Sequence, residues 1–182
     1  LGVLKKLCED LSLVPSGFVV LSEAISHFVK QEEEAPLSGI VAGISSENID
    51  LSIFNLGKLV GTTTILRSVS VEDDMVEGLS RLGVGLESFP SRIILFNQNE
   101  KELEEIKNTL NAANWEVISS SKFIHTPRIE VFDPSKKIMA VALAGGSELG
   151  EVDGVVVANA EEKDTETENL PIEEVNNFEE PD

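Results

Sequence analysis

The chain is poor in the residues on which several common activities depend. Cys8 is its only cysteine, so no disulfide can form within the chain, which fits a reducing compartment. Its two histidines, His27 and His125, lie in no cluster of cysteines or carboxylates, so the sequence indicates no metal site. It contains neither a P-loop nor a Gly-x-Ser-x-Gly nucleophile elbow, which argues against P-loop nucleotide hydrolases and α/β-hydrolases.

Long apolar runs and positive charge are scarce as well. No stretch approaches the roughly 18 to 20 apolar residues that a membrane-spanning helix needs. The chain has 14 Lys and Arg residues against 33 Asp and Glu residues, a net charge of -19. Because such a surface repels phosphate backbones, nucleic acid is not an expected partner.

The negative charge is concentrated toward the end of the chain. Residues 151–182 hold twelve acids and one base, Lys163, and from Ala158 on they include few large apolar side chains. This composition predicts an acidic, disordered tail. The alternative is a short partner-binding motif, whose apolar anchors would be Leu170, Ile172, Val175 and Phe178.

The first 35 residues carry two helical patterns. Leucines recur at helical spacing at positions 4, 7 and 11, which predicts that Cys8 on the same stretch is a buried thiol. The apolar run Phe18–Leu21 predicts a short strand buried on both faces. Ser22 is expected to cap a helix that runs to Gln31, before an acidic run and Pro36.

From residue 39 onward, strand patterns appear between the helical ones. The turn Asn55–Lys58 is typical of a hairpin, because Gly57 can adopt a positive φ. Five strands are predicted, near residues 39–44, 48–54, 59–67, 92–96 and 115–119.

Three helices are predicted between and after these strands. Ser70 is expected to cap the first, which Gly83-Val84-Gly85 ends. The second follows Asn97-Gln98-Asn99, and its buried face is formed by Leu103, Ile106, Leu110 and Ala113. The third has Asp133 as its cap and Pro134 as its first residue, and Gly145-Gly146 should end it. Its inward side chains are expected to be Ile138, Met139, Val141, Ala142 and Leu143.

The order β-β-β-α-β-α-β-α narrows the fold to few candidates. It predicts an α/β fold with a mixed five-stranded sheet of order 3-2-1-4-5 and helices on both faces. Only the second strand should run antiparallel to the rest. This is the ribonuclease-H-like arrangement.

In this order and in its local patterns, the chain resembles the actin, sugar kinase and Hsp70 superfamily, and within it the bacterial PilM and FtsA group. Members of that group have two ribonuclease-H-like lobes with ATP in the cleft between them. The resemblance implies a fragment, in which residues 1–35 are the end of a first lobe with its connecting helix and residues 36–150 are the second lobe. Side chains whose partner sheet is missing should then be exposed, namely Leu4, Leu7, Phe18 and Val20.

The resemblance also implies where the phosphates of a nucleotide would lie. The family's second phosphate motif, Asp-x-Gly-Gly-Gly-Thr-Thr-Asp, matches residues 43–50, and Asp50 is its closing acid. Gly43 stands in place of the leading acid, which in the family helps to position metal and water. The glycines, whose N–H groups approach phosphate, are replaced by Ser45, Ser46 and Glu47, and Glu47 would repel a phosphate.

The family's adenosine motif is an apolar strand followed by a glycine pair and a helix, and it matches residues 92–100. The strand is present, but Asn97 and Gln98 stand in place of the glycines, where their side chains would crowd a nucleotide. The two motifs together predict a vestigial nucleotide cleft lined by Ser45, Ser46, Asp50, Asn97 and Gln98.

These features predict a degenerate actin-like scaffold lobe rather than an enzyme. It would act in the cytoplasm at the inner face of the membrane, in pilus, secretion or cell-division assembly, by binding other proteins and its own copies. The alternative is an ATPase or kinase that binds ATP with magnesium and takes its remaining catalytic groups from the first lobe. A ribonuclease-H-like nuclease is a third candidate, but the first predicted strand carries no acid for two-metal catalysis.

Overall fold

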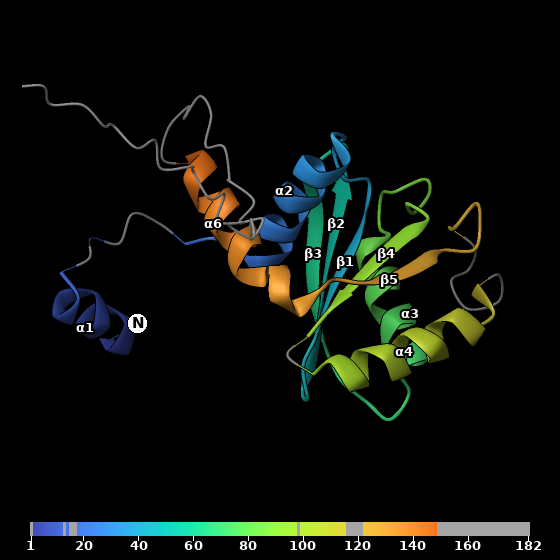
Figure 1. The fold of residues 1–182 in the computed structure, drawn as a ribbon. Coiled ribbons are helices and arrows are strands. Elements are labelled where there is room, and N and C mark those ends of the chain that lie inside the picture. The colour runs from blue at the N-terminus through green and yellow to red at the C-terminus, as the bar shows by residue number, and fades with distance from the viewer. Residues whose placement is uncertain (1, 13, 15–17, 98, 116–121, 149–182) are drawn as a thin grey trace, which may run out of the picture. The chain divides into compact units, whose positions relative to one another are not determined.

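The centre of the fold is a mixed sheet. The computed structural model describes residues 2–12, 14, 18–97, 99–115 and 122–148, and within them five strands follow the order β3-β2-β1-β4-β5 (Figure 1). β1 pairs antiparallel with β2, and β2 with β3, whereas β4 is parallel to both β1 and β5. The predicted ribonuclease-H-like α/β fold is therefore confirmed, with β2 alone antiparallel to the other strands.

The bounds of the elements agree with the prediction over most of the chain. The strands are β1 (Gly39–Ile44), β2 (Asn48–Asn55), β3 (Lys58–Leu66), β4 (Arg92–Phe96) and β5 (Arg128–Val131). The helices are α1 (Gly2–Asp10), α2 (Leu21–Glu33), α3 (Val71–Leu82), α4 (Glu100–Ala112), the 3-10 turn η1 (Pro134–Lys136) and α6 (Lys137–Glu148).

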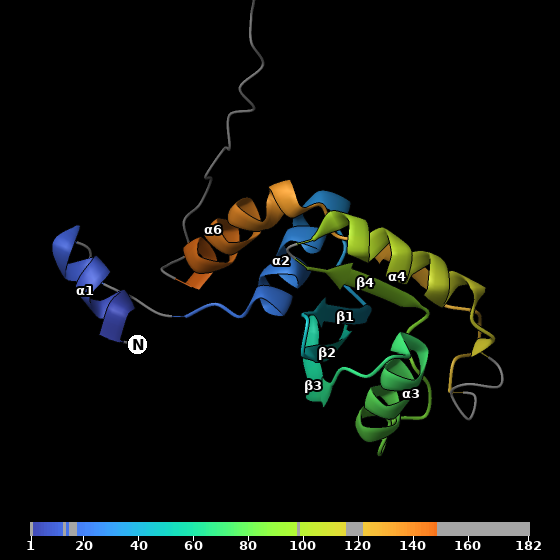
Figure 2. The same ribbon diagram turned by 90° about the horizontal axis from the view of Figure 1, so that it is seen from below.

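β1 lies in the middle of the sheet and is buried on both faces. Its side chains alternate between two apolar clusters, with Ile40 and Ala42 in one and Val41 in the other. Helices α3 and α4 cover the first face, and α2 and α6 lie side by side over the second (Figure 1 and Figure 2). The sheet is thus the middle of three layers, as helices on both faces require.

α3 begins and packs as its sequence indicates. Ser70 accepts a hydrogen bond from the Asp73 N–H, and Gly83 is the C-cap. Gly78 faces the sheet so closely that an added Cβ would lie 2.1 Å from Cδ1 of Ile65 and 2.5 Å from Cδ1 of Leu51. In a close-packed interior no larger side chain fits at this position unless the Ile65 and Leu51 side chains or the helix move.

The fifth strand is not where the sequence predicted it. Trp115 is helical, residues 116–121 lie outside the described part of the chain, and β5 is formed by Arg128–Val131. The indole N–H of Trp115 donates to the Leu110 carbonyl at 2.8 Å, and its ring meets that of Phe123 edge-on with centroids 5.4 Å apart. Trp115 therefore packs against the end of α4. The predicted strand rested on a short apolar pattern in the sequence, and such a pattern alone does not distinguish a strand from a helix.

The predictions for the N-terminal region were wrong in three details. Phe18–Leu21 forms no strand, because Leu21 already belongs to α2. Val20 holds the N-cap position without a side-chain bond, and Ser22 is buried within the helix, where its hydroxyl accepts from Ser52 Oγ at 3.1 Å. Cys8 is half-buried rather than buried, since α1 buries none of its residues.

α6 is longer than the sequence predicted. Asp133 caps the preceding turn as expected, by accepting the Ser135 N–H at 2.9 Å. The helix then continues through Gly145 and Gly146 to Glu148, so the glycine pair is not its end. A glycine pair costs helix stability but does not forbid helix where the flanking turns are held by packing.

The buried face of α6 also differs from the predicted one. Ala140 and Ala144 are buried against α2 and the sheet, whereas Ile138, Met139 and Val141 are 84%, 46% and 41% exposed. Of the other two side chains predicted to face inward, Ala142 is exposed and Leu143 is partly buried. Because apolar residues surround this helix on every side, its sequence carries no periodicity that marks the buried face.

The first 35 residues pack unevenly. The exposure expected for Leu4, Leu7, Phe18 and Val20 is observed, at 47% to 73% of each residue. α2, by contrast, belongs to the core, because Ala24, Ile25, Phe28 and Val29 are buried against the second face of the sheet. The division into two lobes at residue 35 stays a prediction, and the acidic tail lies outside the described residues.

The length and apolar character of a helix decide whether it could span a membrane. Among the helices that the structure describes, none combines the length and the apolar character that crossing a bilayer requires.

Candidate functional site

A cavity of about 430 Å³ lies where β1 and β4 end. These two strands are parallel neighbours, so their carboxyl ends meet at the same edge of the sheet. In open α/β sheets this edge is the usual place for a ligand. The lining comes from the β1–β2 turn, β2, the end of β4 and the first residues of α2, α4 and α6.

Four of the five predicted site residues meet at this cavity. Ser45 and Ser46 line it from the β1–β2 turn, Asp50 from β2, and Asn97 from the end of β4. Gln98 lies outside the described residues. The parallel pairing of β1 with β4 thus brings the two motif segments, which are far apart in the sequence, to one place.

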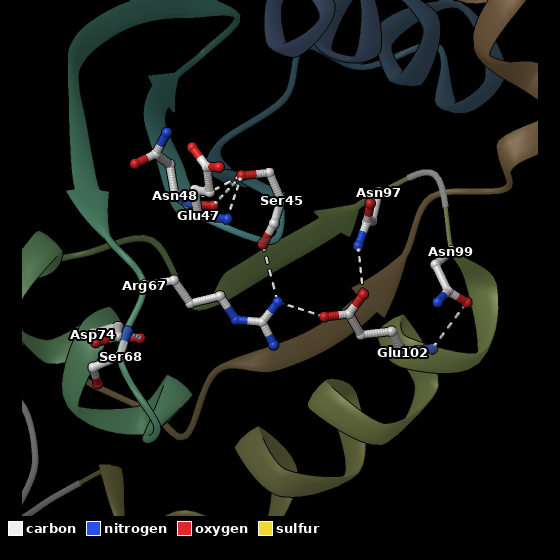
Figure 3. A network of polar contacts seen from close by, with 9 residues as sticks. All are labelled: Ser45, Glu47, Asn48, Arg67, Ser68, Asp74, Asn97, Asn99 and Glu102. Atoms are coloured by element: carbon white, nitrogen blue, oxygen red, sulfur yellow. Dashed lines mark hydrogen bonds and ion pairs between the residues drawn. The ribbon is translucent and has the colours of Figure 1, made fainter.

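The β1–β2 turn is closed by its own serine. The hydroxyl of Ser45 accepts the N–H of Asn48 at 2.9 Å and the N–H of Glu47 at 3.3 Å, and it donates to the Asn48 carbonyl at 3.0 Å (Figure 3). A phosphate-binding turn needs such N–H groups directed at its ligand. In this turn two of them are bonded to Ser45 Oγ instead.

The contact between Gly43 and Phe96 explains why an acid does not fit at the first position of the phosphate motif. The two residues are register partners in the parallel β1–β4 pair, and the Phe96 ring lies over Gly43. A Cβ added at Gly43 would lie 2.5 Å from Cζ of Phe96, which real Cβ atoms essentially never do. An aspartate at this position would therefore displace the ring, and the floor of the cavity is apolar where the motif compared with it in the sequence analysis has a carboxylate.

Asp50 is the residue that the sequence analysis matched to the closing acid of the phosphate motif. Its side chain is exposed at the cavity and accepts a hydrogen bond of 2.6 Å from Thr64 Oγ1 on β3. Because β2 is antiparallel to β1, Asp50 is the register partner of Gly43. The carboxylate therefore lies beside the apolar floor and accepts a hydrogen bond from a neutral hydroxyl.

Arg67 joins three segments at the rim of the cavity. Its Nη1 donates to the Ser45 carbonyl at 2.9 Å and forms an ion pair with the carboxylate of Glu102 (Figure 3). The other oxygen of Glu102 accepts from Asn97 Nδ2 at 3.2 Å. The Arg67 and Glu102 side chains are only 21% and 30% exposed, so this network links the turn, the end of β3 and the start of α4.

Two residues of the site were missed by reasoning from the sequence. Neither Glu102 nor Lys137 was predicted to belong to a site, yet both line the cavity, and Lys137 Nζ donates to the Asn97 carbonyl. The spacing Asn99-x-x-Glu102 is a signal that was available, because it is that of a capping box. Asn99 does cap α4, by accepting the Glu102 N–H at 3.5 Å, while the Glu102 side chain turns toward Arg67 and Asn97 (Figure 3).

This arrangement does not fit the magnesium-bound triphosphate that the resemblance implies. The N–H groups of the turn are bonded to Ser45, and Phe96 occupies the place of the leading acid. Within the part of the chain that the structure describes, no group of three or more His, Cys, Asp or Glu side chains could hold a metal ion. The binding role of the five predicted residues stays a prediction.

Comparisons with known proteins add little to this description. No family model matches the chain, and no curated protein matches it either. A solved structure from Bacteroides thetaiotaomicron, described as a protein with an actin-like ATPase fold and unknown function, is similar with 16% identity and a TM-score of 0.37. The match covers 68% of this chain and 44% of that one, so the chain spans less than half of its length.

Proposed function

We propose that this chain is a non-hydrolysing, actin-like lobe that works as a scaffold. It binds other proteins of a cytoplasmic assembly at the inner face of the membrane, of the pilus, secretion or cell-division kind. In this proposal residues 36–150 are the second lobe of a longer protein, and α2 is the helix that connects it to the first. The single observation that carries the proposal is the internal closure of the β1–β2 turn by Ser45.

The closed turn supports a role without nucleotide hydrolysis. A phosphate that entered the turn would have to displace the Ser45 hydroxyl from the N–H groups of Glu47 and Asn48. Each charge-assisted hydrogen bond that the turn fails to give contributes about 1.5 to 3 kcal/mol. Two such losses weaken binding by at least about a hundredfold, since 1.4 kcal/mol corresponds to a factor of ten.

The Phe96 ring supports the same conclusion by a different route. Hydrolysis of a phosphoanhydride needs charged groups that position metal ion and water. The ring fills the space beside Gly43 in which the leading acid of the motif would have to stand. Loss of catalysis and loss of phosphate affinity therefore have separate structural causes in this chain.

One observation favours a second candidate, a nucleotide-binding lobe that depends on groups of another lobe. The cavity of about 430 Å³ is within the range of small-molecule sites, about 300 to 1,000 Å³. It also retains Asp50 and has the ammonium group of Lys137 in its lining. Groups supplied from outside the chain would then have to compensate for the closed turn.

Calorimetric titration with magnesium-ATP, together with a phosphate-release assay, separates the two candidates. We expect no release above background and no binding tighter than millimolar, because the phosphate contacts are lost. Micromolar binding that Asp50→Ala or Ser45→Trp abolishes would overturn the scaffold proposal. Glu105→Gln, which removes one negative charge from the exposed face of α4, is the control for a general charge effect.

A further inference from the structure

The floor of the cavity is one row of paired residues that crosses four strands. Thr64 pairs with Asp50, Asp50 with Gly43, and Gly43 with Phe96. Paired residues of neighbouring strands lie on the same face of a sheet, and this row lies on the face of Val41, which α2 and α6 cover. From β3 to β4 the row therefore consists of a hydroxyl, a carboxylate, a residue without a side chain and an aromatic ring.

The carboxylate of Asp50 has unused capacity to accept hydrogen bonds. An ionised carboxylate has about four lone-pair sites. Asp50 accepts one bond, from Thr64 Oγ1 at 2.6 Å, and within the described part of the chain it forms no ion pair. A charged acceptor at the cavity therefore has room for a donor that the described residues do not supply.

Several hydrogen-bond donors at the cavity are, by contrast, already bonded within the protein (Figure 3). The N–H groups of Glu47 and Asn48 donate to Ser45 Oγ. Asn97 Nδ2 donates to the carboxylate of Glu102 at 3.2 Å. A ligand that only accepts hydrogen bonds would have to break such bonds, whereas a ligand that donates leaves them in place. The closed turn therefore favours a ligand whose charge is opposite to that of phosphate.

The two other charged side chains in the lining are bonded to Asn97, the residue just after β4. Lys137 Nζ donates to its carbonyl, and Glu102 accepts from its Nδ2. Because β1 lies between β2 and β4, two strand spacings, about 10 Å, separate the strand of Asp50 from β4. The apolar side chains of the lining are Leu21, Ile44 and Phe96. The cavity thus joins a negative end at Asp50 to an apolar surface.

We propose that this cavity binds a primary alkylammonium, whose charged group pairs with Asp50 and whose methylene chain lies on the apolar lining. An ammonium group has three hydrogen-bond donors and no acceptor, which matches the Asp50 end. A divalent metal ion is not matched, because no group of three or more His, Cys, Asp or Glu among the described residues could hold one. The ligand is either the lysine side chain of a partner protein or a free diamine, since both present this group. Its binding is independent of the scaffold role, because it depends only on the closed turn and on the row through Asp50.

NMR titration of the full chain with n-butylammonium chloride, at constant ionic strength, tests the proposal. We expect saturable shifts of the amide signals of Ser46, Asp50 and Phe96. Sodium butyrate and n-butanol have the same carbon chain with a negative and a neutral group. They should bind at least about tenfold more weakly, because neither forms an ion pair with the carboxylate. No saturable binding of n-butylammonium, or equal binding of butyrate, would overturn the proposal.

Two matched variants test the role of Asp50. Asp50→Asn keeps the size of the side chain and removes its charge, so it should weaken binding of n-butylammonium by roughly tenfold. Asp73→Asn removes one charge from an exposed position in the first turn of α3, which covers the opposite face of the sheet, and should leave the affinity unchanged. The amide spectrum of each variant shows whether it is folded. Equal affinities of the two variants would mean that only the overall negative charge attracts the ligand, which contradicts the proposal.

Two further probes distinguish the sources of the ammonium group. Nα-acetyl-lysine methylamide represents a lysine within a protein, and cadaverine represents a free diamine. Tighter binding of the first supports a partner protein, and tighter binding of the second supports a small molecule. Lys163 is the one base among residues 151–182, and stronger probe binding by Lys163→Gln would mean that the chain's own lysine occupies the cavity, which contradicts a ligand from outside. Displacement of the probe by magnesium-ATP would overturn the scaffold proposal as well, whereas failure of the probe to bind contradicts only the ammonium site.

Discussion

The ring of Phe96 lies against the backbone of Gly43, so closely that a Cβ at residue 43 would stand 2.5 Å from Cζ of the ring. The two residues come from neighbouring parallel strands and share one register position. Each therefore constrains the other: Phe96 is accommodated only because residue 43 has no side chain. This pair sets the apolar floor of the cavity.

Substitutions at the two positions should be strongly coupled. Gly43→Ala alone should destabilise the protein by about 1 to 3 kcal/mol, the usual cost of overpacking a filled site. In a Phe96→Ala background the same substitution should cost much less, because the obstructing ring is gone. Urea denaturation of the four proteins gives the coupling energy, expected at about 1 to 3 kcal/mol. Additive effects of the two substitutions would show that the ring does not restrict residue 43.

Removal of the Ser45 hydroxyl should loosen the β1–β2 turn. Ser45→Ala leaves the N–H groups of Glu47 and Asn48 to water and should cost about 1 kcal/mol of unfolding free energy. Amide hydrogen exchange measured by NMR should accelerate at Asn48 in particular. Ser46→Ala, at the next exposed position of the same turn, is the matched control and should change stability by less than about 0.5 kcal/mol. Equal effects of the two substitutions would show that the Ser45 hydroxyl does not stabilise the turn.

Most of the sheet was predictable, and the exceptions have a common physical cause. The sequence of β2 alternates the apolar residues Ile49, Leu51 and Ile53 with polar ones, and β1 is a short apolar run, so both carry a strand signal. The middle of α6, from Ile138 to Leu143, is apolar without a period, so its sequence alone does not indicate which side is buried. The segments of the site were likewise predictable from their motifs. The orientation of the Glu102 side chain toward Arg67 could not be predicted, because it depends on contacts between residues far apart in the sequence.

Glu33 at the end of α2 should make stability depend on pH. Its hydrogen bonds with Arg92, at 2.7 and 2.8 Å, hold the pKa of the carboxyl below its ordinary value. A carboxyl with a lowered folded-state pKa stabilises the protein above its unfolded-state pKa, and that contribution is lost as pH falls through the folded-state value.

The urea midpoints of the wild type and of Glu33→Gln measure this dependence. The wild type should be more stable at pH 7, and the difference should shrink below about pH 4.3, the usual pKa of an unpaired glutamate. Glu105→Gln, at an exposed position of α4, removes the same charge and is the matched control. Because half of the Glu33 side chain is exposed, added salt should also reduce the difference. A pH-independent difference would mean that the pair with Arg92 has no net electrostatic effect.

Two helical glycines should respond to alanine with opposite signs. Gly78→Ala on α3 forces a methyl group to within 2.1 Å of Ile65 Cδ1 and should cost about 1 to 3 kcal/mol. Gly146→Ala on α6 meets nothing within 4 Å and should stabilise the protein by up to about 1 kcal/mol, because alanine favours helix. Thermal unfolding of both variants checks the contrast. Stabilisation by both substitutions would show that α3 can move away from the sheet at little cost.

The central position of β1 has a consequence for the order in which the chain leaves the ribosome. One neighbour of β1 follows at once, across the turn at Ser45, whereas the other, β4, begins only at Arg92. Local pairing closes a small loop and forms early, so a β1–β2–β3 meander can exist before β4 has been made. During that interval the edge of β1 is unpaired and open to contact with other chains, although the finished protein buries this strand completely. The stretch of synthesis between β3 and β4 is therefore when this protein is most in need of a chaperone.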